Sequence, residues 1–214
     1  MGLEYAPRGL FGILTPQANT TVEPEMAILT PPGHAFINAR LMSDKATIEE
    51  RLVDYFDGYG DALGAFANAP LAAIGFACTG ASYLAGTARE DATVEALSNR
   101  TGIPVITAAT AVVDALTALG AKDIALVSPY GATLDEASAR YWTARGFNVA
   151  AKTSAFAATD TFHPIYSMSA ERAGREISEV SGAAVDAVVM LGTGMPTLGP
   201  IARTPMIRRA RLLS

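Results

Sequence analysis

Two segments in the first half of the chain recur in the second half at a nearly constant spacing. Leu14-Thr-Pro-Gln-Ala-Asn-Thr-Thr-Val-Glu23 has a weaker echo, 113 residues later, in Val127-Ser-Pro-Tyr-Gly-Ala-Thr-Leu-Asp-Glu136. Ala77-Cys-Thr-Gly-Ala-Ser-Tyr-Leu84 is echoed 114 residues later by Leu191-Gly-Thr-Gly-Met-Pro-Thr-Leu198. Internal repeats at one offset are typical of a duplicated architecture. The sequence therefore predicts two similar halves that face each other across one cleft.

The only cysteine of the chain breaks this repeat. Cys78 in the first half corresponds to Gly192 in the second half. A thiol can act as a nucleophile or a proton donor, whereas glycine has no side chain to do either. This asymmetry makes Cys78 the first candidate for a catalytic residue.

Composition excludes several classes of function. The net charge is −5 and no basic cluster occurs before the last few residues, which argues against a nucleic-acid partner. A single cysteine excludes an internal disulfide and fits a reducing cytosol. The uncharged stretch 62–88 contains proline, polar residues and several glycines, so we expect a buried strand and loop there, not a membrane span. The N-terminus does not resemble a signal peptide, and we expect a cytoplasmic protein.

Apolar runs of strand length alternate with segments of helical character along the chain, which predicts an α/β fold with a mostly parallel sheet in each half. The expected strands are 10–15, 34–41, 71–77, 103–107, 123–128, 147–152 and 185–191, and the expected helices are 21–30, 46–67, 86–99, 108–119, 133–145 and 169–181.

The repeat divides the chain into a first lobe, 1–122, and a second lobe, 123–214. The second-half counterpart of the strand 103–107 would begin near residue 216, beyond Ser214. We therefore expect the second lobe to lack a terminal strand and helix.

Cys78 follows the buried strand 71–77 and precedes a small polar turn, Thr79–Ser82. Backbone N–H groups at such a strand end favour the thiolate and so its nucleophilicity. The alternative is that Cys78 is a small buried hydrophobe, the commoner role of a free cysteine. Its place at the end of a strand, opposite an echoed loop, favours the catalytic reading.

The loop that mirrors Cys78 offers backbone donors and a hydroxyl from Gly192, Thr193 and Gly194, which suit a carboxylate or an oxyanion. Thr79 and Gly80 offer the same groups from the first half. The alternative is a tight turn that needs glycine for its conformation alone. The glycines do not match a dinucleotide-binding fingerprint, and the chain has no P-loop motif.

Three further strand-end residues are candidates for substrate binding: Gln17, Asn19 and Tyr130, of which Tyr130 is the mirror of Gln17. Asn19 could instead cap the following helix, and Tyr130 could pack against its turn. Thr20 with Glu23, and Thr133 with Glu136, match the capping-box pattern at a helix start.

The two histidines, His34 and His163, are expected at surface or capping positions, although His163 could border the cleft. No group of residues has the spacing of metal ligands, so we expect no metal site.

At these motifs the chain resembles the aspartate/glutamate racemase superfamily, and most closely its maleate cis–trans isomerase and arylmalonate decarboxylase branch. The resemblance rests on Gly12–Glu23, Ala77–Gly80, Ser128–Tyr130 and Gly192–Leu198, and it covers nearly the whole chain. It implies two Rossmann-like lobes related by pseudo-twofold symmetry, with a small mono- or dicarboxylate bound between them and no cofactor or metal. It also implies a homo-oligomer.

The resemblance also implies how the chemistry is divided between the lobes. Racemases of the superfamily use one cysteine from each lobe, and so do maleate isomerases, whose first-lobe cysteine adds to the alkene. Arylmalonate decarboxylases keep only the second-lobe cysteine. In this chain Cys78 matches the first-lobe cysteine and Gly192 replaces the second, while Asn19 and Tyr130 match substrate-binding residues. A further family asparagine has no counterpart around 161–166.

Three functions follow as hypotheses. The first is isomerisation of a maleate-like substrate through covalent addition of Cys78, with the helper cysteine replaced by backbone donors, water or Tyr130. The second is decarboxylation of a malonate, with Cys78 delivering the proton to the face opposite that used by the known decarboxylases. The third is a non-catalytic carboxylate-binding protein. Racemisation is disfavoured because Gly192 supplies no second acid or base.

Overall fold

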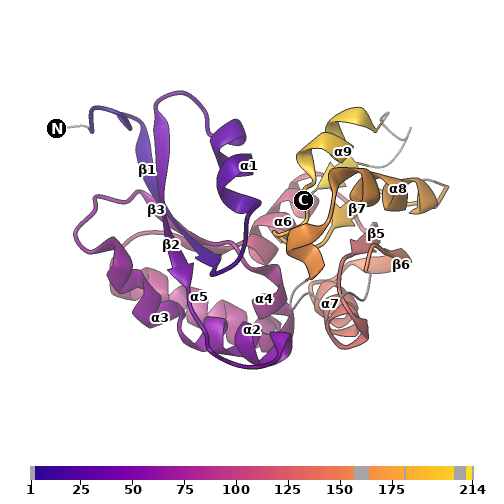
Figure 1. Ribbon diagram of the computed structural model, residues 1–214, viewed down its shortest axis with the longest axis horizontal. Helices are drawn as coiled ribbons and strands as arrows, with labels where there is room; N and C mark the ends of the chain where they lie inside the picture. Colours follow the sequence, from indigo (N-terminus) through magenta and orange to yellow (C-terminus); the bar gives the residue numbers. More distant parts are fainter. Residues whose placement is uncertain (1–2, 157–163, 181, 205–210, 214) are drawn as a thin grey trace. The chain divides into compact units, whose positions relative to one another are not determined.

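Each half of the chain forms a parallel β-sheet with helices on both faces (Figure 1). The computed structural model describes residues 3–156, 164–180, 182–204 and 211–213. Two compact units divide the chain, Met1–Ala108 and Ala109–Ser214, and each is described below by itself. The predicted α/β class with two parallel sheets is confirmed.

The first unit has the strand order β2-β1-β3-β4, all parallel. Helix α1 lies on one face of this sheet, and α2, α3 and α5 gather on the other face (Figure 1). The strands are β1 (Gly9–Pro16), β2 (His34–Leu41), β3 (Ala73–Phe76) and β4 (Val105–Thr107), and the helices are α1 (Val22–Leu29), α2 (Ile48–Asp57), α3 (Tyr59–Ala62), η1 (Leu63–Phe66), α4 (Thr79–Ala85) and α5 (Thr87–Thr101).

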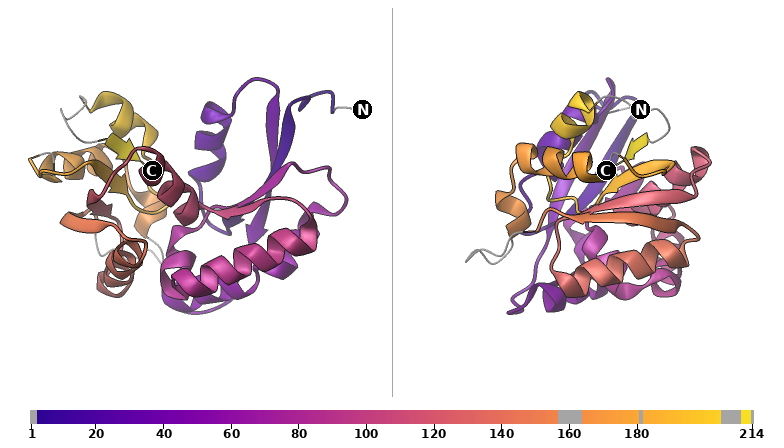
Figure 2. Two further views of the ribbon diagram at one scale, coloured as in Figure 1. Left: turned by 180° about the vertical axis from the view of Figure 1, so that it is seen from behind. Right: turned by 90° about the vertical axis from the view of Figure 1, so that its right-hand side faces the viewer.

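The second unit repeats this order as β6-β5-β7-β8, again all parallel. Helix α7 covers one face of the sheet and α8 the other, as the right-hand view of Figure 2 shows. The strands are β5 (Asp123–Ser128), β6 (Asn148–Ser154), β7 (Ala187–Met190) and β8 (Arg211–Leu213), and the helices are α6 (Ala108–Ala118), α7 (Ala132–Ala144), η2 (Pro164–Ser167), α8 (Ala170–Val180) and α9 (Leu198–Arg203). The same strand order in both units is what a duplication produces.

The expectation that the second half lacks a terminal strand is wrong. Strand β8 pairs with β7 in the second unit as β4 pairs with β3 in the first. Ile74 pairs with Val105, 31 residues later, whereas Ala187 pairs with Arg211 after only 24 residues. Because this connection is shorter, β8 begins at Arg211, before residue 216, where the repeat offset predicts the strand.

The boundary between the units also differs from the expected one after residue 122. It falls after Ala108, so α6 belongs to the second unit. The single helix expected over 46–67 is divided into α2, α3 and η1, with Gly58 between the first two. Thr79–Ser82 is not a separate turn, because these residues form the first turn of α4.

The two cores consist of the apolar faces of the sheets and of the helices that cover them. Leu14, Phe76 and Tyr59 are fully buried in the first unit, and Leu126 and Trp142 in the second. Strand β5 is buried from its second residue to its last, as expected for a central parallel strand that is covered on both faces. Among the described residues, no helix combines the length and the apolar character needed to cross a bilayer.

Candidate active site

The first group of candidate residues lies where β1 and β3 end. The two strands are parallel neighbours, with Leu14 paired with Phe76, and the Ala77 amide donates to the Leu14 carbonyl at 2.8 Å. The segments that follow them therefore leave the same edge of the sheet. This edge carries five of the predicted residues: Gln17, Asn19, Cys78, Thr79 and Gly80.

Cys78 occupies the position directly before α4 and is 3% exposed. The backbone amides of Gly80 and Ala81 point at its sulfur, as the sequence predicts for a strand-end thiol. Burial nevertheless outweighs these donors and raises the pKa of the Cys78 thiol to about 12. The expectation that this position favours the thiolate is therefore wrong for the free protein, in which the sulfur keeps its proton at neutral pH.

Alkylation of Cys78 should depend steeply on pH. Because only the thiolate reacts and its pKa is about 12, the rate with iodoacetamide should rise about tenfold per pH unit from pH 7 to pH 10, without a plateau. Mass spectrometry of the intact protein measures this rate. A plateau near pH 8, as for an ordinary exposed thiol, would contradict the burial argument.

Two tyrosines close to Cys78 are missing from the sequence prediction. Tyr55 of α2 receives a hydrogen bond from the Gln17 backbone amide and another from Arg51, while Tyr59 of α3 stacks on Phe76 with ring centroids 3.7 Å apart. Burial raises the pKa of both phenols, and the nearby Cys78 thiol group, when ionised, raises it further. Their i, i+4 spacing within a helical segment is the signal that could have revealed them.

The Gln17 side chain forms a hydrogen bond within the first unit. Its Oε1 atom accepts a hydrogen bond from the Ser43 amide at 2.7 Å, just beyond the end of β2. This bond fixes the loop after β1 to the neighbouring strand end. A role for Gln17 in substrate binding remains a prediction.

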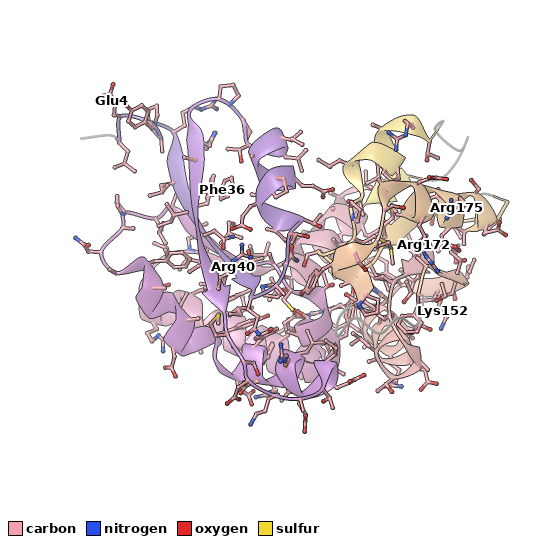
Figure 3. All side chains as sticks on the ribbon, viewed as in Figure 1. Glu4, Phe36, Arg40, Lys152, Arg172 and Arg175 are labelled. Atoms are coloured by element: carbon pink, nitrogen blue, oxygen red, sulfur yellow. The ribbon has the colours of Figure 1, made fainter. Side chains whose placement is uncertain are left out.

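Asn19 stabilises the start of α1. Its Oδ1 atom accepts hydrogen bonds from the amides of Thr21 and Val22 at 2.9 and 3.0 Å. Arg40, labelled in Figure 3, donates to the Asn19 carbonyl at 2.9 Å and forms an ion pair with Glu23. Asn19 is thus a helix-capping residue, and its role toward a substrate carboxylate remains a prediction.

Replacing Asn19 with alanine should lower the free energy of unfolding by about 1 kcal/mol, because two amides at the start of α1 lose their acceptor. Asn19→Asp keeps the acceptor and should retain that stability. If Asn19 also binds a substrate carboxylate, the added negative charge should still reduce turnover. Urea denaturation and an activity assay on the same two variants separate these roles.

Neither predicted capping box forms. The N-cap of α1 is Thr21, not Thr20, and Asn19 supplies the acceptor there. Helix α7 begins at Ala132, so Thr133 lies inside its first turn. A capping box is present instead at the start of α2, between Thr47 and Glu50.

The second group of candidate residues lies where β5 and β7 end, within the second unit. The Leu191 amide donates to the Val127 carbonyl at 2.9 Å, which brings Tyr130 to the same sheet edge as Gly192, Thr193 and Gly194. Tyr130, Gly192 and Gly194 are buried and Thr193 is half-buried. The Met195 amide closes a turn on the Gly192 carbonyl at 3.0 Å.

Gly192 is required by its surroundings and by its backbone conformation. Its φ is +88°, a region that side chains other than glycine rarely adopt. A Cβ atom at this position would lie 2.7 Å from Ile165 Cδ1, 2.8 Å from the Tyr130 hydroxyl and 3.1 Å from Pro129 Cγ. The space that a second cysteine would need is therefore taken up, in part by the phenol of Tyr130.

Two histidines remain among the residues singled out from the sequence. His34 lies on β2 and stacks on Phe11, with ring centroids 5.7 Å apart, while His163 lies outside the described residues. Within the described part of the chain, no cluster of three histidine, cysteine, aspartate or glutamate residues could hold a metal ion.

The fold is that of an α/β protein with duplicated parallel sheets, and the candidate residues lie at the carboxyl ends of its strands. The model of the arylmalonate decarboxylase family matches residues 11–208. The chain belongs to this family. The predicted resemblance is thereby confirmed.

Solved structures of two kinds of enzyme share the fold. A maleate isomerase from Pseudomonas putida, solved as a Cys-to-Ala variant with maleate, is 24% identical with a TM-score of 0.85, over 96% of this chain and 86% of that one. A Nocardia farcinica maleate cis–trans isomerase, a Cys-to-Ser variant with a covalently bound succinylcysteine intermediate, is 25% identical with a TM-score of 0.80, over 90% and 82%. A Gly-to-Cys variant of arylmalonate decarboxylase is 21% identical with a TM-score of 0.73, over 96% and 87%. No curated protein matches the sequence.

Proposed function

We propose that the protein is a cofactor-independent enzyme that acts on a small carboxylate through Cys78. The observation that carries the proposal is the placement of this buried thiol at the end of β3, with the Gly80 and Ala81 amides at its sulfur. These donors stabilise negative charge on sulfur when a substrate is bound. Asn19, Gln17, Thr79 and Gly80, together with Tyr130, Gly192, Thr193 and Gly194, are proposed to bind the substrate.

Isomerisation of a maleate-like cis-dicarboxylate is the first reaction we propose. The Cys78 sulfur adds to one alkene carbon as its proton passes to the other, and the former double bond rotates as a single bond. The C–S bond then breaks as that second carbon returns a proton to sulfur, which leaves the trans product and the free thiol. The likeness to maleate isomerases, one of them solved with a succinylcysteine intermediate, supports this reaction. One sulfur suffices for addition and elimination, so the glycine at position 192 does not exclude it.

Decarboxylation of a substituted malonate is the second candidate. A thiol with a pKa of about 12 holds its proton at neutral pH and is therefore suited to protonate an enediolate after carbon dioxide leaves. The family match supports this reaction too. Because Cys78 takes the place of the first-half cysteine, we expect the product enantiomer opposite to that of decarboxylases that use the second-half cysteine.

Proton NMR in deuterated buffer, with maleate and an aryl-substituted malonate offered together, tests the proposal. Conversion of maleate to fumarate identifies the isomerase. Loss of the malonate, with deuterium at the α-carbon of the product, identifies the decarboxylase. If neither substrate changes while maleate raises the melting temperature, the protein is the non-catalytic carboxylate binder that the sequence leaves open.

A further inference from the structure

One arginine of the first unit bonds to the loop that carries two of the proposed substrate-binding residues. Arg40 is the penultimate residue of β2 and pairs in register with Thr15 of β1. Its side chain, labelled in Figure 3, therefore lies beside the end of β1 and the segment that follows it. We call this segment, residues 16–19, the β1 loop; it contains Gln17 and Asn19.

The Arg40 guanidinium joins three parts of the first unit. Its Nη1 atom donates to the Asn19 carbonyl at 2.9 Å and to the Pro16 carbonyl at 3.4 Å. Its Nη2 atom donates to both carboxylate oxygens of Glu23, the second residue of α1, and the longer of these bonds measures 2.7 Å. A planar guanidinium can make such a set of bonds at once, whereas an ammonium group cannot. Arg40 thus ties the β1 loop to β2 and to α1.

The orientation of the Asn19 side chain depends on this loop. Its Oδ1 atom accepts hydrogen bonds from the Thr21 and Val22 amides, and its own main-chain amide donates to the Pro16 carbonyl at 3.0 Å. A carboxylate accepts hydrogen bonds, so the Nδ2 group is the part of Asn19 that can bind one. The direction in which this group points is set by the main chain, which Arg40 holds through the Asn19 carbonyl.

Stability alone is a weak reason for this arrangement. The side chains of Arg40 and Glu23 are 35% and 34% exposed, and ion pairs that solvent reaches to this extent contribute little to the free energy of folding. Arg40 also bonds two main-chain carbonyls, whose oxygen atoms carry partial negative charge. A guanidinium on these oxygens offsets that charge beside a site for an anion. The arrangement therefore fits a role in binding better than a role in stability.

The second half of the chain differs at the equivalent positions. Ser154 takes the place of Arg40 in the register of the second sheet, and its hydroxyl accepts a hydrogen bond from the main-chain amide two residues later. Glu136, the counterpart of Glu23, lies 3.8 Å from an arginine of its own helix. The arginine that bridges a strand-end loop and a helix thus occurs in the half that carries Cys78.

We propose that Arg40 is a positioning residue of the carboxylate site: its guanidinium holds the β1 loop so that Asn19 can donate to a substrate carboxylate. This inference rests on the proposed function, in which Asn19 binds that carboxylate. Arg40 acts through Asn19 and not through a contact of its own with the substrate. Because Cys78 lies on a different segment, after β3, the loss of Arg40 should weaken substrate binding far more than it slows the reaction of bound substrate.

Steady-state kinetics of Arg40→Met, with whichever of maleate and an aryl malonate the protein converts, tests the proposal. The variant removes the guanidinium and keeps an aliphatic side chain, so KM should rise at least about tenfold while kcat changes less than about threefold. Arg40→Lys keeps the charge but cannot make all of the bonds, and its KM should rise nearly as much. Arg89→Met is the matched control, because it removes an ion pair with Asp57 on the other face of the sheet; both constants should stay within about twofold.

Two kinetic results would overturn the proposal. An unchanged KM in Arg40→Met would show that the arginine serves the structure alone. Full recovery of KM in Arg40→Lys would show that a positive charge suffices and that the bonds to the loop do not matter.

Hydrogen exchange tests the hold on the β1 loop without any substrate. The amides of Asn19, Thr21 and Val22 should exchange at least about tenfold faster in Arg40→Met than in the unmodified protein, while amides of α5 keep their rates. Unchanged exchange at these three amides would overturn the proposal even if the protein converts neither substrate. Faster exchange in a protein that neither converts nor binds maleate or malonate would instead refute the proposed function.

Discussion

Cys78→Ala is expected to lower turnover at least about a thousandfold, whichever of the two proposed substrates is accepted. The side chain supplies the bond-forming sulfur in isomerisation and the proton in decarboxylation, and removal of a catalytic nucleophile commonly costs this much or more. Because Gly192 has no side chain, the second half offers no cysteine that could take over. The loss should therefore appear in kcat and not only in KM.

Cys78→Ser is the matched control for this experiment. It keeps the size and hydrogen-bonding capacity of the side chain at the start of α4 but replaces the thiol with a much weaker acid and nucleophile. We expect it to retain the melting temperature of the unmodified protein and to lose turnover as fully as Cys78→Ala does. Turnover in either variant comparable to that of the unmodified protein would show that Cys78 is not the reacting group.

Gly192→Cys, which would restore the cysteine pair implied by the repeat, should destabilise the protein and fail to create a two-cysteine enzyme. A residue other than glycine at φ +88° costs about 1–3 kcal/mol in backbone strain. Contacts of 2.7 Å with Ile165 and 2.8 Å with the Tyr130 hydroxyl add an overpacking cost of about 1–3 kcal/mol. Urea denaturation should show a total loss of roughly 2–6 kcal/mol in the free energy of unfolding.

Gly131→Ala provides the control for that substitution. Gly131 lies beside Tyr130 but has φ −67°, and an added Cβ would meet only Phe156, at 3.8 Å. Gly131 is the N-cap of α7, where alanine is less favourable than glycine, so the free energy of unfolding should fall by at most about 1 kcal/mol. If Gly192→Cys were as stable as Gly131→Ala, the second-half site would be open enough to take a cysteine, and the absence of one would need another explanation.

The substitutions at Cys78 and at Gly192 test the same difference between the two halves of the chain. The first half keeps a buried thiol, and the second half has closed around the equivalent glycine. The Tyr130 hydroxyl lies 2.8 Å from the position that a Cβ atom at residue 192 would take.

Much of the fold could be predicted because it follows from local pattern. Apolar runs of strand length between helical segments indicate parallel sheets, and the two echoes place Cys78 and Gly192 at equivalent strand ends. Strand β8 could not be predicted in this way, since its place depends on the length of a connection that the repeat does not preserve. The capping residues also could not be predicted in this way, because Asn19, not Thr20, supplies the acceptor for the amides at the start of α1.

The sequence by itself determined the class of the fold, the duplication, the family resemblance and the choice of Cys78, since all of these depend on periodicity and on residue identity. Only the tertiary structure decided the environment of that residue. Burial keeps the thiol protonated, α2 and α3 bring Tyr55 and Tyr59 close to it, and Tyr130 fills the space beside Gly192. Desolvation and close packing arise from residues far apart in the chain, and a linear pattern does not record which of them meet.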